Sequence, residues 1–498
     1  MRAILFLIGI VIGITFCNCF NPYVIAISAF AFILISRGCI VLISTKFPYA
    51  IRGSVILNYG LLLCIAVTIG SASALLNAPR YGRSTFIIAG YNPDKEYLIE
   101  GYVLSHISKA NVEQHQVEIK TVTALNERSI VRCRNAKMLL FTPADIQLRQ
   151  GDVIKFRCNL RLTDSVAGKD WNGRYTAFVK NKNNLVVVGK YVNIRVFAGK
   201  LRDKIARIID RSNLTEDSRI LLKALILADR SGLARKDIAI YRDAGVAHLL
   251  AVSGLHTGIL CSAILYLTLP LLLFGGRKLR YVVLIIILWL FTILTGMNYS
   301  TLRATLMITL AAIAWIYERQ HDQLSIVCLA ASFILIFSPA GLWDIGFQLS
   351  FVCVASLAIF TTPLNPVCKR EHPLVYKVCE SLLVTLIATI SLAPLTIFYF
   401  GSHPTSFLIT NIILLPLMPV YMILGIIETM ILLCGYEIIF ISEIIDLFTN
   451  FIVNFTSIFN GRSIKINMSA PALILCLTLL ISAATVIRIK YPPRREMS

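Results

Sequence analysis

The chain has 498 residues, of which 57% are hydrophobic and only 15% are charged, and its formal net charge is +21. Its mean hydropathy is +0.74. Apolar runs of about 20 residues, the length needed to cross the hydrocarbon of a bilayer, recur along the sequence. These features exclude a soluble globular fold, a disordered chain and a fibrous protein. The bilayer is the solvent for most of the chain, and α-helices are expected to cross it.

Residues 1–78 are predicted to form three membrane crossings, at about 3–20, 23–44 and 54–77. The first is expected to be a retained crossing and not a cleaved signal peptide, because it lacks the small-residue cleavage site. The link between the second and third crossings contains three basic residues: Arg37, Lys46 and Arg52. Basic links mark the cytoplasmic side. The third crossing therefore delivers residues 79–200 to the opposite, extracytoplasmic face.

Residues 79–200 differ in character, because apolar and polar residues alternate there in short runs separated by turn residues. The runs are Tyr97–Leu104, Gln116–Val122, Ile130–Cys133, Met138–Phe141, Val153–Cys158 and Asn184–Val188. This period predicts a small antiparallel β-domain. An OB-like barrel suits the strand count, and a sandwich fits nearly as well. The domain is basic, which indicates an anionic partner such as nucleic acid or attraction to lipid headgroups.

Cys133 and Cys158 are the cysteines of this β-domain, and both end predicted strands. In an oxidising compartment they could form one disulfide. Two buried free thiols are the alternative.

Residues 201–246 are amphipathic and too polar to span, and they predict surface-lying helices that link the β-domain to a second bundle. Residues 247–490 are predicted to form that bundle, followed by a basic cytoplasmic tail at 491–498. Its crossings are expected near 249–274, 281–296, 301–317, 324–338, 345–362, 380–400, 405–433, 437–459 and 470–488. The sequence therefore predicts a polytopic α-helical membrane protein of about 10–12 transmembrane helices, with an inserted all-β, OB-like extracytoplasmic domain.

Polar groups inside hydrocarbon are costly, and they persist where they are paired or line a wet path. One cluster, from Ala244 to Gly258, carries His248, Ser253, Gly254 and His256 at the start of a crossing. It predicts either a pore-lining break in a helix or tight helix packing with satisfied histidines. A second cluster carries Ser300 and Arg303. The arginine could meet phosphates, reach to the interface, or pair with an acid.

Two further clusters lie later in the chain. Asp344 and Gln348 are four residues apart on one predicted helical face, and Asp344 is expected to be a structural partner for Arg303 or for a helix end. Asn411 lies among Pro394, Pro416 and Pro419, a spacing that predicts kinked or discontinuous helices. The sequence contains no HExxH, GxxxxGK[ST], GxSxG or HxHxDH motif, so we assign no catalytic, cofactor-binding or metal-binding residue and expect no enzyme.

Several of these stretches resemble the ComEC family of competence proteins. The resemblance covers, in order, Asp229–Leu233, Arg242–His256, Ser300–Ala304, Asp344–Phe351 and Ala393–Gly401 with Asn411. It implies an inner-membrane channel that passes single-stranded DNA into the cytoplasm during natural transformation. His248, Ser253, Gly254, His256, Ser300, Arg303, Gln348 and Asn411 would then lie along the strand's path. The β-domain would receive the strand, and its candidates for base stacking, for which core packing is the commoner fate, are Tyr102, Phe141, Phe156, Trp171 and Tyr175.

Many long members of the family carry a C-terminal metallo-β-lactamase-like domain, and this sequence lacks its histidine motif. We therefore expect a short form, with nuclease activity supplied by another protein; an unrecognised nuclease activity of the β-domain is left open. The implied partners are membrane lipid, a cytoplasmic helicase-like motor, single-strand-binding proteins and a periplasmic DNA receptor. A homo-oligomer is left open.

Two other functions are compatible with the sequence. A secondary transporter of a small or amphipathic anion would show inverted repeats with paired broken helices, and no such symmetry is visible. A non-transport membrane scaffold would not need polar motifs within its crossings.

Overall fold

The computed structural model describes the following residues: 6–12, 66, 69, 96–109, 112–124, 130–143, 145–146, 148–163, 174–179, 181–250, 252–274, 276–318, 322–364, 373–466, 468–469, 471–473, 475–480 and 482. The chain divides into two compact units, each described by itself below. One comprises residues 1–196 with 325–347, and the other comprises residues 197–324 with 348–498. Most of the three crossings predicted within residues 1–78 lies outside the described residues.

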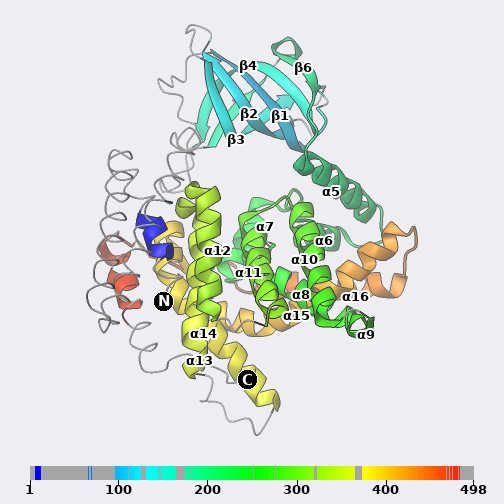
Figure 1. The fold of residues 1–498 in the computed structure, drawn as a ribbon. Helices are drawn as coiled ribbons and strands as arrows, with labels where there is room; N and C mark the ends of the chain where they lie inside the picture. Colours follow the sequence, from blue (N-terminus) through cyan, green and yellow to red (C-terminus); the bar gives the residue numbers. More distant parts are fainter. Residues whose placement is uncertain are drawn as a thin grey trace. The chain divides into compact units, whose positions relative to one another are not determined.

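Six strands between Glu96 and Lys190 form a β-barrel (Figure 1). Its strands are β1 (Glu96–Lys109), β2 (Val112–Ala124), β3 (Ile130–Pro143), β4 (Asp152–Thr163), β5 (Arg174–Phe178) and β6 (Leu185–Lys190), with a 3-10 turn η2 (Lys182–Asn184) before β6. β1 pairs with both β2 and β4, and β3 pairs in parallel with β5, which in turn pairs with β4. The first five strands therefore close on themselves, and β6 is added beside β4. This is the OB-like barrel expected from the sequence.

Alternation of side chains builds the barrel's interior. Tyr97, Ile99, Phe156 and Leu160 are fully buried, together with residues of β2, β3 and β5. β1 shifts register at Gly101, where an added Cβ would lie 2.6 Å from the Glu118 carbonyl oxygen. Only glycine fits there without displacing the backbone of β2.

The barrel corrects two expectations about individual side chains. Cys158 is a free, buried thiol, and burial raises its pKa to about 12. It therefore does not form the predicted disulfide with Cys133, whose side chain lies outside the described residues. The strand order also separates the two cysteines, because β5 lies between β3, which carries Cys133, and β4, which carries Cys158. Phe156, which the sequence offered as a surface base-stacking residue, is a core residue.

The predicted linker helices are α5 (Ile194–Asp210), α6 (Glu216–Leu227) and α7 (Arg235–Asp243). α6 packs its apolar face into protein, while Glu216 and Asp217 at its start are exposed. Its buried residues, including Leu222 and Leu225, form one apolar cluster with Tyr421 and Ile445 of two long apolar helices. The apolar face of α6 is therefore covered by protein. Gly425 has no side chain and so lets Leu222 approach the helix that carries this glycine.

Helices occupy most of the predicted crossings, but the one expected at 249–274 is divided into two helices, and the one expected at 470–488 lies partly outside the described residues. The helices are α8 (Gly254–Leu267), α9 (Leu271–Phe274), α10 (Gly276–Leu294), α11 (Tyr299–Ile316), α12 (Gln323–Phe337), α13 (Ile345–Leu364), α14 (Pro373–Phe400), α15 (Phe407–Leu433) and α16 (Ile439–Ser457). A 3-10 turn, η3 (Pro339–Trp343), precedes α13, and the short strands β7 (Ser402–Pro404) and β8 (Ser463–Lys465) pair with each other. Among the described residues, four helices are long and apolar enough to cross a membrane: α11, α14 over Cys379–Phe400, α15 and α16.

The prolines do not divide their helices. α14 runs through Pro394, and α15 runs through both Pro416 and Pro419. The expected discontinuous helices are therefore absent from these two segments. Neighbouring apolar contacts hold α15 together where proline removes a backbone donor.

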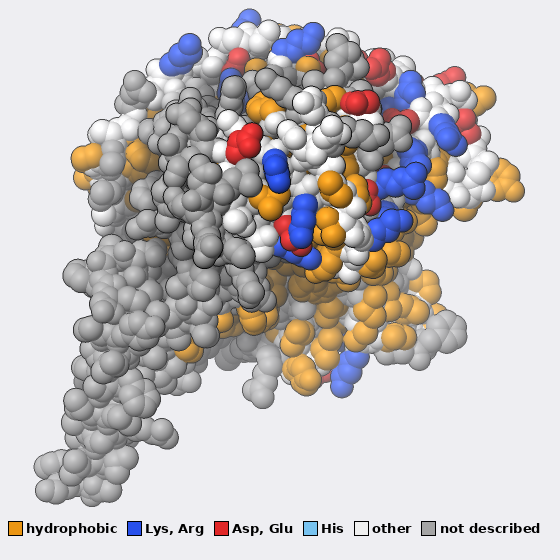
Figure 2. Space-filling view, turned by 90° about the horizontal axis from the view of Figure 1, so that it is seen from above, with side chains coloured by type: hydrophobic (Ala, Val, Ile, Leu, Met, Phe, Trp, Pro, Cys, Tyr) orange, Lys and Arg blue, Asp and Glu red, His pale blue; other side chains and the backbone are white. Residues whose placement is uncertain are grey.

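The outer faces of the helices are apolar. α10 exposes Val282, Ile286 and Leu290, and α16 exposes Leu447 and Phe451. Figure 2 shows a broad area of hydrophobic side chains with few charged ones among them. Such an area would be unfavourable in water and is expected where helices meet lipid.

Replacing Gly101 by Ala is expected to destabilise the barrel, because the new Cβ would meet the Glu118 carbonyl and the Val117 side chain. Overpacking of this kind costs about 1–3 kcal/mol, a shift on the order of 10 °C for a domain of this size. The measurement is the temperature at which protease cleaves the barrel within the purified full-length chain. Gly189→Ala is the matched control, since its Cβ would meet no described atom within 4 Å. Equal cleavage temperatures for the two variants would contradict this account.

Candidate functional site

The start of α8 is capped by its own side chains. Ser253 is the N-cap, and its Oγ accepts a hydrogen bond from the Leu255 N–H at 3.2 Å. The His256 ring turns back onto the cap: its Nδ1 accepts from the Ser253 N–H at 3.2 Å and lies 3.0 Å from the Ser253 Oγ. Because Nδ1 is an acceptor, the neutral ring carries its proton on Nε2. His256 is 1% exposed, and its Nε2 finds no partner among the described residues.

The same turn of α8 lies against α11. A Cβ built on Gly254 would lie 3.8 Å from the Cβ of Ala304, the residue that follows Arg303. The beginning of α11 is tied to the end of α10 by polar side chains, including a 2.7 Å hydrogen bond between Thr292 and Thr305. The two predicted clusters, at His248–Gly258 and at Ser300–Arg303, therefore meet where α8 packs on α11.

Arg303 lies one turn inside α11 and is 2% exposed. Its guanidinium lies 5.9 Å from the ring centroid of Phe351 in α13, a cation–π distance. One turn earlier in α13, Gln348 accepts a 2.7 Å hydrogen bond from the Tyr399 hydroxyl of α14. Arg303 and Gln348 are thus set by the same segment of α13, which connects α11 to α14 through polar and aromatic contacts.

A second polar neighbourhood joins the turn after α7 to the start of α15. The Thr410 hydroxyl donates to the Ala244 carbonyl at 2.6 Å, and the Ser406 hydroxyl donates to the Asp243 carbonyl at 3.3 Å. Gly245 has a φ of +78°, and a Cβ there would lie 2.8 Å from the Phe407 Cβ. The turn that leads into His248 is therefore locked to α15.

Asn411 belongs to this second neighbourhood. Its Nδ2 donates to the Phe407 carbonyl at 2.7 Å, while its Oδ1 has no partner among the described residues. Further along α15, Glu428 is fully buried; one carboxylate oxygen accepts from the Ser442 hydroxyl at 2.9 Å, and the other has no partner among the described residues. α15 thus carries two buried acceptors at different depths.

The other predicted residues occupy simpler positions. His248 lies exposed in the turn before α8, and Ser300 lies half-buried in the first turn of α11. Asp344 accepts a hydrogen bond from the Phe347 N–H at 2.7 Å and so caps the start of α13. His403, in β7, is partly desolvated, which lowers the pKa of its ring.

Two residues of the site were missed by sequence reasoning. Ser406 and Thr410 were not singled out because each is an ordinary polar residue at a helix end, and their hydrogen bonds to the carbonyls of Asp243 and Ala244 span more than 160 residues of sequence. Gly245 carried the available signal, since a glycine before an apolar run often marks a positive φ. Among the described residues, no group of three His, Cys, Asp or Glu side chains is placed to hold a metal.

The arrangement defines a class of protein: a polytopic α-helical membrane protein with an inserted OB-like barrel, whose helix bundle holds buried polar groups. A sequence model of the competence protein family matches residues 225–492. The chain therefore belongs to the competence protein family, as the resemblance to ComEC proteins indicated. The matched range includes His248, His256, Arg303, Gln348 and Asn411, and it leaves the barrel outside.

A curated relative agrees with this assignment. Over 205 residues, or 41% of its length, the chain is 30% identical to ComE operon protein 3 of Bacillus subtilis (strain 168). The match covers 25% of that protein, so the chain spans a minor part of the relative. No solved structure matches the chain.

Substitutions at two glycines of the first cluster test the packing of the α7–α8 turn against α15. Gly245→Ala is expected to lower the yield of folded protein several-fold, because alanine is strained at a φ of +78° and its Cβ would meet Phe407. Gly258→Ala is the control: it lies within α8, its Cβ would meet no described atom within 4 Å, and alanine favours the helix. Yield is measured by size-exclusion chromatography in detergent. A normal yield of Gly245→Ala would show that the close packing of this turn on α15 does not require glycine.

Proposed function

We propose that this chain is an inner-membrane channel through which single-stranded DNA enters the cytoplasm during natural transformation. Membership in the competence protein family and the relationship to a ComE operon protein support a role in competence. The proposal places the barrel on the extracytoplasmic side and the C-terminus in the cytoplasm, in accord with the basic links of the sequence.

The observation that carries the proposal is the presence of two buried polar groups, His256 on α8 and Arg303 on α11, in helices that pack together. His256 directs a buried N–H donor that no described residue accepts, and Arg303 places a buried cation one residue from the same contact. A backbone phosphate offers acceptor oxygens and no donors, so it complements both groups. Burying the His256 donor costs about 1–3 kcal/mol unless a partner arrives. A passing strand, or the water that accompanies it, would be that partner.

The OB-like barrel suits the first contact with the strand. Single-strand binding combines positive charge with aromatic side chains on which bases stack, and residues 80–200 contain 20 Lys and Arg against 10 Asp and Glu. Of the aromatic residues suggested by the sequence, Tyr102 and Phe156 are buried. Phe141 stacks on Phe178 with ring centroids 4.8 Å apart, and Phe178 is 47% exposed. This aromatic pair is the surface we assign to base stacking.

The force for transport must come from another protein, because the sequence carries no nucleotide-binding motif. The proposal therefore includes a cytoplasmic helicase-like motor or single-strand-binding proteins that draw the strand inward. A periplasmic DNA receptor would deliver DNA to the barrel.

Arg303→Gln and His256→Ala are each expected to lower transformation about 10- to 100-fold, the loss that corresponds to one charge-assisted or buried hydrogen bond. DNA binding at the cell surface should stay normal. Transformation frequency is measured in a deletion strain complemented with each variant. Lys236→Gln, an exposed change in α7, is the control and should transform normally.

The same variants distinguish a DNA channel from a small-anion transporter. Proteoliposomes containing the wild-type chain should take up a labelled oligonucleotide when a strand-binding protein is enclosed, and the Arg303→Gln chain should not. Small-anion flux without strand uptake would contradict the proposal. Normal transformation by a well-folded Arg303→Gln chain would also contradict it.

Phe178→Ala is expected to weaken oligonucleotide binding by the full-length chain about 5- to 100-fold, since base stacking on an aromatic ring contributes about 1–3 kcal/mol. Fluorescence anisotropy of a labelled oligothymidylate measures the affinity. Val187→Ala removes a comparably exposed apolar side chain from β6 and should leave the affinity unchanged. Identical affinities for both variants would assign the strand to another surface.

A further inference from the structure

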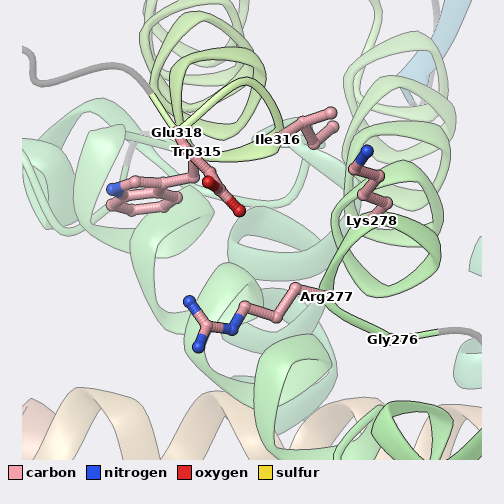
Figure 3. Close-up of a pocket in the computed structure, with 6 residues that line it drawn as sticks. All are labelled: Gly276, Arg277, Lys278, Trp315, Ile316 and Glu318. Atoms are coloured by element: carbon pink, nitrogen blue, oxygen red, sulfur yellow. The ribbon is translucent and has the colours of Figure 1, made fainter.

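α10 and α11 form an antiparallel hairpin. A tight turn at residues 295–298 joins them at one end, and the other end is open. At the open end, a hollow of about 420 Å³ is lined by the first residues of α10 and the last residues of α11: Gly276, Arg277, Lys278, Trp315, Ile316 and Glu318. Figure 3 shows Arg277 and Glu318 on opposite sides of this hollow in that view, with the Trp315 ring near the carboxylate.

The hollow carries separated charges of both signs. Arg277, Lys278 and Glu318 are exposed, and no ion pair within 4 Å joins any two of these fully described residues. Gly276, at φ +64°, begins α10, whose first backbone N–H groups have no partner within the helix. One part of the hollow therefore favours an anion, and Glu318 favours a cation beside it.

The hollow is expected to lie at the membrane surface, at the depth of the lipid headgroups. α11 has 18 residues, extends roughly 27 Å, close to the thickness of a hydrocarbon core, and is apolar enough to cross a membrane. A crossing by α11 would place its last residues, and the start of α10 beside them, at headgroup level. Trp315 and the exposed Tyr317 suit that level, because such amphipathic rings are enriched at membrane interfaces. The basic run at Arg277 predicts the cytoplasmic leaflet.

We infer that this hollow binds the phosphoethanolamine headgroup of a membrane lipid. The lipid phosphate lies between Arg277, Lys278 and the N–H groups at the start of α10. The primary ammonium of the headgroup donates to the Glu318 carboxylate. Trp315 packs beside the headgroup and offers a π-face to the ammonium.

Glu318 selects this ligand over others with a phosphate. A purely anionic lipid would place its negative headgroup against the carboxylate, and a DNA phosphate would meet the same repulsion. A phosphocholine headgroup has the right charges, but its trimethylated nitrogen has no N–H to donate. Among headgroups with both charges, the binding affinity should therefore rise with the number of N–H donors on the headgroup nitrogen.

Native mass spectrometry of the delipidated full-length chain in detergent tests the inference. Dioleoyl phosphatidylethanolamine should bind at least 5-fold more tightly than dioleoyl phosphatidylcholine or dioleoyl phosphatidylglycerol. Glu318→Gln should abolish this preference while phosphatidylglycerol binds as well as before or better. Arg277→Gln combined with Lys278→Gln should weaken binding of all three lipids, and Lys236→Gln should change nothing.

Equal binding of phosphatidylethanolamine and phosphatidylcholine by the wild-type chain would overturn the inference. An unchanged preference in Glu318→Gln would also overturn it. Displacement of bound lipid by an oligothymidylate would assign the hollow to nucleic acid instead. Each variant is first shown to elute as the wild type does on size exclusion, which separates a loss of binding from a loss of fold.

Discussion

The capping of α8 by Ser253, with the His256 ring turned back onto the cap, sets the geometry on which the candidate site depends. A helix that begins inside a bundle must satisfy its first N–H groups, because neither lipid nor buried protein supplies water. Ser253 and His256 perform this task together, and in doing so they fix which ring nitrogen is left to face outward from the cap. The same few residues therefore start the helix and set the orientation of a buried donor.

The bundle must present apolar faces to lipid and also retain polar groups in its interior. Its outer faces are aliphatic, whereas threonines, Asn411, Glu428 and Arg303 lie between the helices. Small residues at contact points, such as Gly254 against Ala304 and Gly425 against Leu222, let the helices approach closely enough to shield these groups. Shielding raises the strength of each polar contact, so few are needed to hold a defined arrangement.

The sequence predicted the class of fold and the helices well, because apolar runs bounded by charge leave few alternatives. Barrel strands were predicted less completely. The runs at 130–133 and 138–141 belong to one long strand, and β5 was not predicted, since it is short and lies beyond a turn-rich stretch. α6 was placed on a surface because its charged residues suggested solvent, while its apolar face in fact packs into protein. For the site, local contacts such as Ser253–His256 follow from spacing, but the pairing of Thr410 with Ala244 depends on the tertiary fold.

The unbroken course of α15 through its prolines leaves two backbone oxygens without their usual helical donors. Pro416 and Pro419 have no N–H, so the carbonyls of Ile412 and Leu415 cannot be bonded by the residue four positions later. Both lie within four residues of Asn411, whose Oδ1 also has no partner among the described residues. α15 therefore presents a short ladder of acceptors whose chemistry is the reverse of the donors on α8 and α11. A polymer that carries phosphate oxygens along its backbone and amino groups on its bases has counterparts for both.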